Sequence, residues 1–239
     1  MTARIDRLWP DPTEQLHDDE LMDSIDHDGV RLNFVSSVDG AATRDGLSGG
    51  LGGAADKRYF ELLRRVADVV VVGAGTVRHE GYGPMVVDRP RRGQPVFAIV
   101  TGRLDLDPAS PIFTKAPVRP VIITTEEAEG KAAFADVADV VVAGSSRVDA
   151  ALAVDALRTR GLRRILCEGG PSLFGSFLAA DAVDELCLTV APSLEAGDAP
   201  RIARGETAPR DMHLAGVLRS GDTLLLRYAR LTPPGRRTR

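Results

Sequence analysis

Few residues of this chain suit a metal centre or a disulfide framework. The 239 residues include only two cysteines and four histidines. The histidines, which are His17, His27, His79 and His213, do not have metal-ligand spacing. Both cysteines, Cys167 and Cys187, lie inside apolar runs, where reduced buried thiols are the usual state. The sequence therefore predicts no metal site and no disulfide.

Long apolar runs and a basic charge excess are also absent. No uncharged apolar run reaches the roughly 18 residues that a membrane helix needs. Residues 1–28 are rich in Asp and Glu and lack the apolar core of a signal peptide, which predicts a cytoplasmic protein. The formal net charge is −4, so a nucleic-acid partner is not expected. The one dense basic cluster, Arg236–Arg239, reads as a solvated chain end.

The length and composition favour one large domain. Hydrophobic residues make up 44% of the chain and charged residues 27%, as in an ordinary globular protein. We divide the chain into an extended or loosely helical lead-in over residues 1–28, one domain over 29–232 and a basic tail over 233–239. No internal repeat is visible.

Strand and helix patterns alternate along the domain. Strands are predicted at Val30–Val38, Asp68–Gly73, Pro95–Thr101, Arg119–Thr125, Asp139–Ala143, Arg163–Glu168, Asp184–Ala191, Met212–Arg219 and Thr223–Leu231. Helices are predicted at Asp56–Val66, Val77–Gly81, Asp149–Arg160 and Pro171–Ala180, with a weaker pattern at Glu126–Asp136. Continuous apolar runs such as Val69–Val72 are typical of central parallel strands. The sequence thus predicts an α/β fold with a mixed, mostly parallel sheet and an antiparallel C-terminal hairpin.

A first glycine turn follows the strand that ends at Gly73. Gly73 and Gly75 let a backbone approach a ligand closely, and Thr76 lies where a helix N-terminus offers free N–H groups to an anion. The turn lacks the third glycine of the G-x-G-x-x-G pattern. The alternative is a tight structural turn that Thr76 caps.

A second glycine turn follows the strand that ends at Glu168. Its residues are Gly169, Gly170, Pro171, Ser172 and Leu173. Adjacent glycines expose successive N–H groups to a phosphate, and Pro suits the first helical turn. Two such turns on one sheet favour a dinucleotide, although a purely structural turn is the alternative.

A third strand ends at Thr101-Gly102-Arg103. We predict that Thr101 and Arg103 contact the cofactor, with the Arg103 guanidinium on an adenosine 2′-phosphate, which would select NADPH. A surface arginine is the alternative. The glycine-dense loop 48–53 either closes over the cofactor or is a flexible connector.

Five ordered motifs in residues 30–231 resemble a known family. They are Asn33–Gly40, the helix Asp56–Arg64 with the strand after it, Gly73–Arg78, Glu168–Pro171 and Val183–Pro192. Together they resemble the C-terminal reductase domain of the bifunctional riboflavin-biosynthesis deaminase–reductase, which is itself similar to dihydrofolate reductase. The zinc motif of the deaminase half is missing, so a stand-alone reductase-type domain is expected.

The resemblance implies roles for individual residues. Gly50, Thr76, Glu80 and the run 170–176 would line the cofactor. Ser48, Arg64 and Glu168 would lie on the substrate side, with Asp39 near the ribose. Asn33 would also contact substrate, although family members often carry Lys there. Residues 80–89 depart from the family's phosphate-binding pattern, and Arg89 is the candidate replacement for its arginine.

The resemblance also implies a reaction and an assembly. NADPH would reduce the ribosylamino side chain of 5-amino-6-(5-phosphoribosylamino)uracil, in a homodimer. Asp39 or Glu168 would orient the substrate or relay a proton. Two alternatives stay open: a reductase of a dihydropterin or dihydrofolate, and a non-catalytic NADP-binding module.

Overall fold

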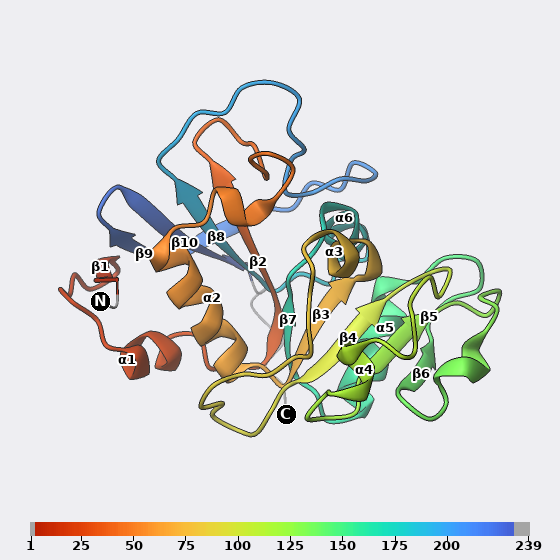
Figure 1. The fold of residues 1–239 in the computed structure, drawn as a ribbon. Helices are drawn as coiled ribbons and strands as arrows, with labels where there is room; N and C mark the ends of the chain where they lie inside the picture. Colours follow the sequence, from red (N-terminus) through yellow and green to blue (C-terminus); the bar gives the residue numbers. More distant parts are fainter. Residues whose placement is uncertain (1–2, 232–239) are drawn as a thin grey trace.

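One ten-stranded sheet organises the chain (Figure 1). The computed structural model describes residues 3–231. The strand order is β1-β9-β10-β8-β2-β7-β3-β4-β5-β6. Neighbours from β8 through β6 pair in parallel, and β10 pairs antiparallel with both β8 and β9. The predicted fold class, a mixed and mostly parallel sheet with an antiparallel C-terminal hairpin, is confirmed.

The elements follow one another in a largely alternating order. The strands are β1 (Asp6–Trp9), β2 (Gly29–Ser37), β3 (Val69–Gly73), β4 (Val96–Val100), β5 (Val121–Thr124), β6 (Asp139–Val142), β7 (Arg164–Cys167), β8 (Glu185–Ala191), β9 (Met212–Ser220) and β10 (Thr223–Arg230). The helices are α1 (Asp18–Asp23), α2 (Ala54–Val66), α3 (Ala74–His79), α4 (Pro111–Thr114), α5 (Ala150–Thr159) and α6 (Pro171–Ala179), with short 3₁₀ turns η1 (Ser48–Gly50) and η2 (Lys131–Phe134).

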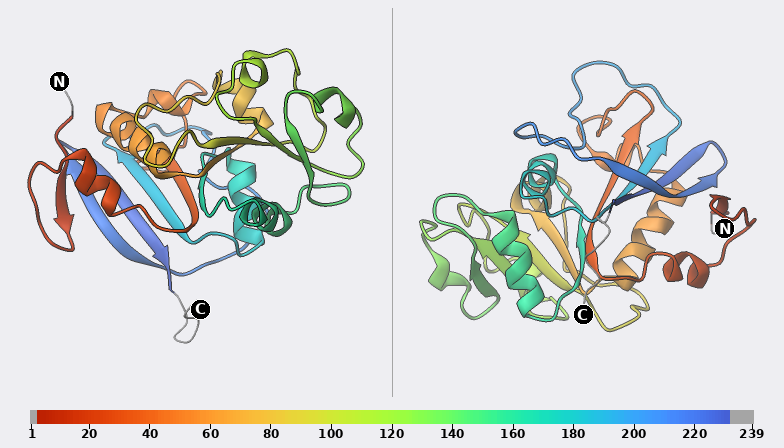
Figure 2. Two further views of the ribbon diagram at one scale, coloured as in Figure 1. Left: turned by 90° about the horizontal axis from the view of Figure 1, so that it is seen from below. Right: turned by 180° about the vertical axis from the view of Figure 1, so that it is seen from behind.

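Helices cover the two faces of the parallel part of the sheet. Helices α2, α3 and α4 pack on one face and α5 and α6 on the other, so that the valines of β3 are fully buried (Figures 1 and 2). Seen from behind, β9 and β10 have no helix over them (Figure 2). Within residues 3–231, no helix has the length and apolarity needed to cross a membrane.

The structure differs from the predicted elements in the segment before Gly29, around residues 126–136, at α4 and at α3, which begins at Ala74 and not at Val77. The segment before Gly29 contributes β1, which pairs antiparallel with β9, and α1, which contacts α2. Burial explains this, because Ile5, Leu21 and Ile25 are at most 1% exposed and join the core beneath α2. The expected helix over 126–136 is reduced to η2, and α4 was not expected. The predicted basic tail, 233–239, lies outside the described residues.

Candidate active site

A cavity of about 760 Å³ opens between α2 and the starts of α3 and α6. Strands β2, β3 and β7 are neighbours in the sheet and direct their carboxyl ends toward it, as expected for a ligand site in an open α/β sheet. Twelve of the predicted site residues line it. They are Asn33, Ser48, Arg64, Gly73, Gly75, Thr76, Glu80, Glu168, Gly170, Pro171, Ser172 and Leu173.

Helix α2 contributes a polar and aromatic stripe to one wall. Asp56, Phe60 and Arg64 all line the cavity and lie at successive four-residue steps, which places them on one helix face. The Arg64 guanidinium carbon lies 4.2 Å from the centre of the Phe60 ring, within range of a cation–π contact. An acid, an aromatic ring and a base thus follow one another along this wall.

Glu168 holds Arg64 in place. The Arg64 Nε and Nη2 donate hydrogen bonds of 2.6 and 2.7 Å to the two carboxylate oxygens of Glu168, which is a bidentate pair. The Tyr82 hydroxyl donates a third hydrogen bond, of 2.8 Å, to Glu168 Oε2. The Glu168 side chain is 1% exposed. Its two oxygens are therefore already engaged before any substrate binds.

Burial and the Arg64–Glu168 ion pair shift the pKa values of Arg64 and Tyr82. Burial alone would lower the pKa of Arg64, but the hydrogen bonds and charge of Glu168 outweigh it and raise that pKa. Burial, followed by the negative charge of Glu168, raises the pKa of Tyr82 far above its ordinary value. Arg64 is therefore a permanent cation and Tyr82 a neutral hydrogen-bond donor.

The two glycine turns form a cradle on the opposite wall. Helix α3 begins after Gly73 and α6 after Gly170, and neither N-terminus has a side-chain cap. A Cβ built on Gly170 would lie 2.6 Å from the Thr76 Oγ1, so the two turns are in contact. Their free N–H groups suit a pyrophosphate.

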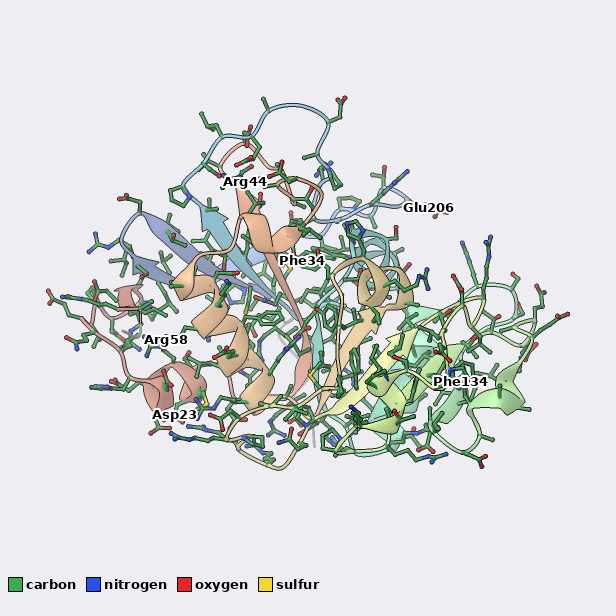
Figure 3. All side chains as sticks on the ribbon, in the orientation of Figure 1. Asp23, Phe34, Arg44, Arg58, Phe134 and Glu206 are labelled. Atoms are coloured by element: carbon green, nitrogen blue, oxygen red, sulfur yellow. The ribbon has the colours of Figure 1, made fainter. Side chains whose placement is uncertain are left out.

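The backbone conformation at position 169 and one neighbouring ring both require a glycine there. Its φ is +92°, and a Cβ there would lie 2.8 Å from the Phe34 ring. Phe34 lies on β2 near the middle of the molecule and stacks on Phe174 with ring centres 4.9 Å apart (Figure 3). Gly169 itself does not line the cavity, but it sets the direction in which α6 begins.

The loop after β2 reaches across to α3. Ser48 N donates to Glu80 Oε1 at 3.1 Å, and the His79 Nε2 lies 2.9 Å from the Gly46 carbonyl oxygen. Gly50 does not line the cavity, and its carbonyl accepts a hydrogen bond from Arg44. The contact brings a predicted substrate residue, Ser48, against a predicted cofactor residue, Glu80.

Asp39 does not reach the cavity. Its carboxylate accepts hydrogen bonds from the Ser37 hydroxyl and from the backbone N–H groups of Glu195 and Ala196. These contacts, the Ser37 bond first, lower the pKa of Asp39 to about 2. The residue therefore joins two loops as a carboxylate, and the structure does not bring it together with Glu168.

Like Asp39, Gly50 and Gly169, three more predicted residues lie outside the cavity lining. The Thr101 hydroxyl is buried and accepts the N–H groups of Arg103 and Leu104, which shapes the turn after β4. Arg103 is exposed at that turn. The Arg89 side chain is 83% exposed beside Asp88, so Arg89 does not supply the missing phosphate contact in this cavity.

Sequence reasoning missed Asp56 and Tyr82. Asp56 is half-buried, and its carboxylate lies near Thr189 on β8. Burial raises the pKa of Asp56, and the Thr189 hydroxyl and Lys57 ammonium oppose that rise. The spacing of Asp56, Phe60 and Arg64 is a signal for one shared face. Tyr82 lies outside any helix or strand, shortly after α3, and only the folded chain shows it beside Glu168.

Comparison with known proteins places these features in a family. A family model described as the RibD C-terminal domain matches residues 29–226. The chain belongs to the RibD C-terminal domain family. This confirms the resemblance on which the expected roles rest.

Relatives and solved structures agree with this placement. The 2,5-diamino-6-ribosylamino-4(3H)-pyrimidinone 5′-phosphate reductase of Methanothermobacter thermautotrophicus is 31% identical over 183 residues, which cover 74% of this chain and 84% of that protein. The riboflavin biosynthesis protein RibD of Mycobacterium tuberculosis is 29% identical over 70% of this chain, which spans only 43% of that protein. A pyrimidine reductase-like protein of Corynebacterium diphtheriae superposes with a TM-score of 0.76 at 28% identity and covers 89% of this chain and 95% of its own. The relatives are pyrimidine reductases of riboflavin biosynthesis.

Proposed function

We propose that this chain is an NADPH-dependent reductase of a phosphorylated ribosylaminopyrimidine. The reaction converts the ribosylamino side chain into a ribityl group. The observation that carries the proposal is the arrangement of two uncapped helix starts, at Gly73 and Gly170, directly across one cavity from the Arg64–Glu168 pair. One wall fits a dinucleotide and the other fits a polar ring system, in a family whose named relatives are reductases.

The described residues fit the nicotinamide cofactor. Gly170 and Thr76 both line the cavity, and a Cβ at position 170 would lie only 2.6 Å from the Thr76 Oγ1, so a glycine is needed for the two turns to meet here. Ser172 and Leu173 offer backbone N–H groups at the start of α6. The cofactor supplies a hydride when it is bound. The exposed Arg103 stays our candidate for selecting NADPH over NADH, through the adenosine 2′-phosphate.

Reduction of the open-chain imine form of the substrate needs one hydride and one proton. A bound NADPH would supply the hydride to C1′ and be left as NADP⁺, and the imine nitrogen would take up the proton. In this chain, Arg64 presents a fixed cation to the substrate, and Tyr82 remains protonated beside it.

Glu168 acts as a positioning residue in this proposal. Its carboxylate oxygens bind Arg64 and Tyr82 at 2.6–2.8 Å, so the contacts favour orientation of Arg64 over a proton relay. Asp39, which is occupied by two loop N–H groups, would act on the site only through the loops that it joins.

Turnover with purified protein tests the proposal. We expect the near-ultraviolet absorbance of NADPH to fall when the phosphorylated ribosylaminopyrimidine is added, faster than with NADH. Absence of NADPH oxidation, with the chain folded and NADPH bound, would leave a non-catalytic NADP-binding module.

Reduction of a dihydropterin is the second candidate. The exposed position of Arg89 favours it, because the family's phosphate contact is not rebuilt in the cavity and a dihydropterin needs none. Dihydrofolate in the same assay separates the two. Oxidation of NADPH with dihydrofolate but not with the ribosylaminopyrimidine would favour this candidate.

We also propose a cytoplasmic homodimer. The buried thiols of Cys167 and Cys187 agree with a reducing compartment. Leu188 on β8 and Leu226 on β10 are half-buried on the sheet face that no helix covers, and a second copy would bury them (Figure 2). A monomeric mass in light scattering at micromolar concentration would contradict the dimer.

A further inference from the structure

Part of the cavity is lined by a stretch of chain that forms no helix or strand. Residues 80–95 join α3 to β4 (Figure 1), and within them Tyr82, Pro84 and Met85 line the cavity. We call residues 82–87 the wall segment. An irregular segment has no ladder of backbone hydrogen bonds, so its position depends on a few individual contacts.

The Gln94 side chain supplies the hydrogen bonds that the wall segment lacks. The Val87 N–H donates to the Gln94 Oε1 at 2.8 Å, and the Gln94 Nε2 donates to the Val87 carbonyl oxygen at 2.8 Å. Within residues 3–231, no other hydrogen bond reaches the backbone of residues 83–88. A glutamine amide has the donor and the acceptor of a peptide group, so Gln94 takes the place of a neighbouring strand at Val87.

Gln94 itself lies between two anchored parts of the chain. After it, β4 begins at Val96, and Phe97 stacks on Tyr82 with ring centres 5.9 Å apart. Before it, Arg92 donates two hydrogen bonds, of 2.7 and 2.9 Å, to the carboxylate of Asp26, whose side chain is 10% exposed. The Gln94 amide is therefore attached to backbone that is fixed independently of the wall segment.

The wall segment carries a contact on which the Arg64–Glu168 pair depends. The Tyr82 hydroxyl donates to Glu168 Oε2 at 2.8 Å, and the Arg64 guanidinium carbon lies 5.6 Å from the centre of the Tyr82 ring. Met85, which is 3% exposed, lies between Tyr82 and Val87 in the chain. A displacement of Val87 therefore shifts the Met85 side of the cavity and strains the Tyr82 contact with Glu168.

We propose that Gln94 is a positioning residue for the substrate side of the cavity. Its amide fixes Val87 and, through the wall segment, keeps Tyr82 where the hydroxyl binds Glu168. Gln94 does not line the cavity, so it acts only through the residues that it holds. The inference rests on the proposed reductase function, because it concerns how that site is kept in shape.

Gln94→Met tests this role, because methionine has a similar length and lacks both hydrogen-bonding groups of the amide. We expect KM for the phosphorylated ribosylaminopyrimidine to rise about 3- to 10-fold, with a smaller change in kcat, because the loss of neutral hydrogen bonds displaces the wall and removes no reacting group. Gln15→Met makes the same exchange at an exposed residue and should keep the original KM. An unchanged KM in Gln94→Met would overturn the proposal.

A double-mutant cycle with Tyr82→Phe separates positioning from a general loss of stability. Tyr82→Phe removes the hydroxyl that binds Glu168, so Gln94→Met should raise KM little further in that background. Thermal unfolding establishes that each variant is folded at the assay temperature. A purely structural role would raise KM by the same factor in both backgrounds, and that result would overturn the proposal.

Two measurements need no turnover. The amide hydrogen of Val87 should exchange faster in Gln94→Met than in the unaltered chain, and equal protection would contradict the contact. Calorimetric titration of the phosphorylated ribitylaminopyrimidine, the product of the proposed reaction, should show the same non-additive cycle in Kd. An additive cycle in Kd would overturn the role of Gln94. Absence of NADPH oxidation by the unaltered chain, with the non-additive cycle present, would overturn the reductase function and support the role of Gln94.

Discussion

The Arg64–Glu168 pair shows how single residues differ in role from what their type suggests. An acid at a strand end reads as a proton donor in a sequence, but here its oxygens are occupied by a guanidinium and a phenol. At neutral pH, the site therefore presents the Arg64 cation and the neutral Tyr82 hydroxyl, and Glu168 holds both in place.

Replacement of this acid separates positioning from proton transfer. Glu168→Gln leaves Arg64 as a partly buried cation without a counter-charge, so we expect the free energy of unfolding to fall by about 3 kcal/mol. We also expect KM to rise more than kcat falls, because Arg64 is displaced while no proton carrier is lost. Denaturant unfolding and steady-state kinetics measure the two effects. Unchanged turnover and stability would contradict any role of Glu168 in the site. A large fall in kcat at constant KM would instead support a proton relay through Glu168.

Asp39 gives a pH-dependent contact between two loops. Its pKa in the folded chain is about 2, below the ordinary 3.8, so the carboxylate contact is complete above about pH 4 and is lost as the pH falls toward 2. We expect the amide hydrogens of Glu195 and Ala196 to be protected above this range. In Asp39→Asn, they should exchange faster at neutral pH and show no added change between pH 4 and 2. Equal protection in both proteins would contradict the contact.

At the scale of the secondary-structure elements, one glycine of the turns is needed for stability and another is not. Gly169→Ala would force a side chain into positive φ and against Phe34, so we expect the free energy of unfolding to fall by about 1–3 kcal/mol. Gly75→Ala, inside α3, meets no atom within 4 Å and should leave stability unchanged or slightly higher.

The same pair of variants tests whether the cofactor binds against the start of α3. If a phosphate lies against the backbone of α3, Gly75→Ala should weaken NADPH binding although the fold is intact. Thermal unfolding and calorimetric NADPH titration measure the two properties. Equal NADPH affinity in Gly75→Ala and the unaltered chain would contradict a close approach at Gly75.

Elements were predictable where the chain repeats a simple pattern. The valines of β3 and the Pro-initiated helix α6 follow local rules, and both formed as expected. Burial of the lead-in could not be predicted, because Ile5 and Leu21 are scattered among charges, and only pairing with β9 and packing under α2 buries them. Local pattern cannot reveal a partner more than two hundred residues away in the chain.

Only one wall of the site was predictable from local sequence. The residues within each glycine turn are adjacent in the chain, so Gly73 and Gly170 could be identified from the two turns. The opposite wall combines Glu168, which follows β7, with Arg64 of α2 and with Tyr82, which follows α3. The placement of β7 between β2 and β3 brings these distant segments together, and no local sequence rule predicts it.

At the scale of the whole molecule, the sheet order places the glycine turns of α3 and α6 across one cavity from the Arg64–Glu168 pair. We propose that the first wall holds the cofactor, the second holds the substrate, and hydride passes between them. The most direct measurement uses NADPH carrying deuterium at the transferred position of C4, with product analysis by mass spectrometry and NMR. We expect one deuterium at C1′ of the ribityl group in each product molecule. Product without deuterium, or NADPH oxidation without a ribityl product, would contradict it.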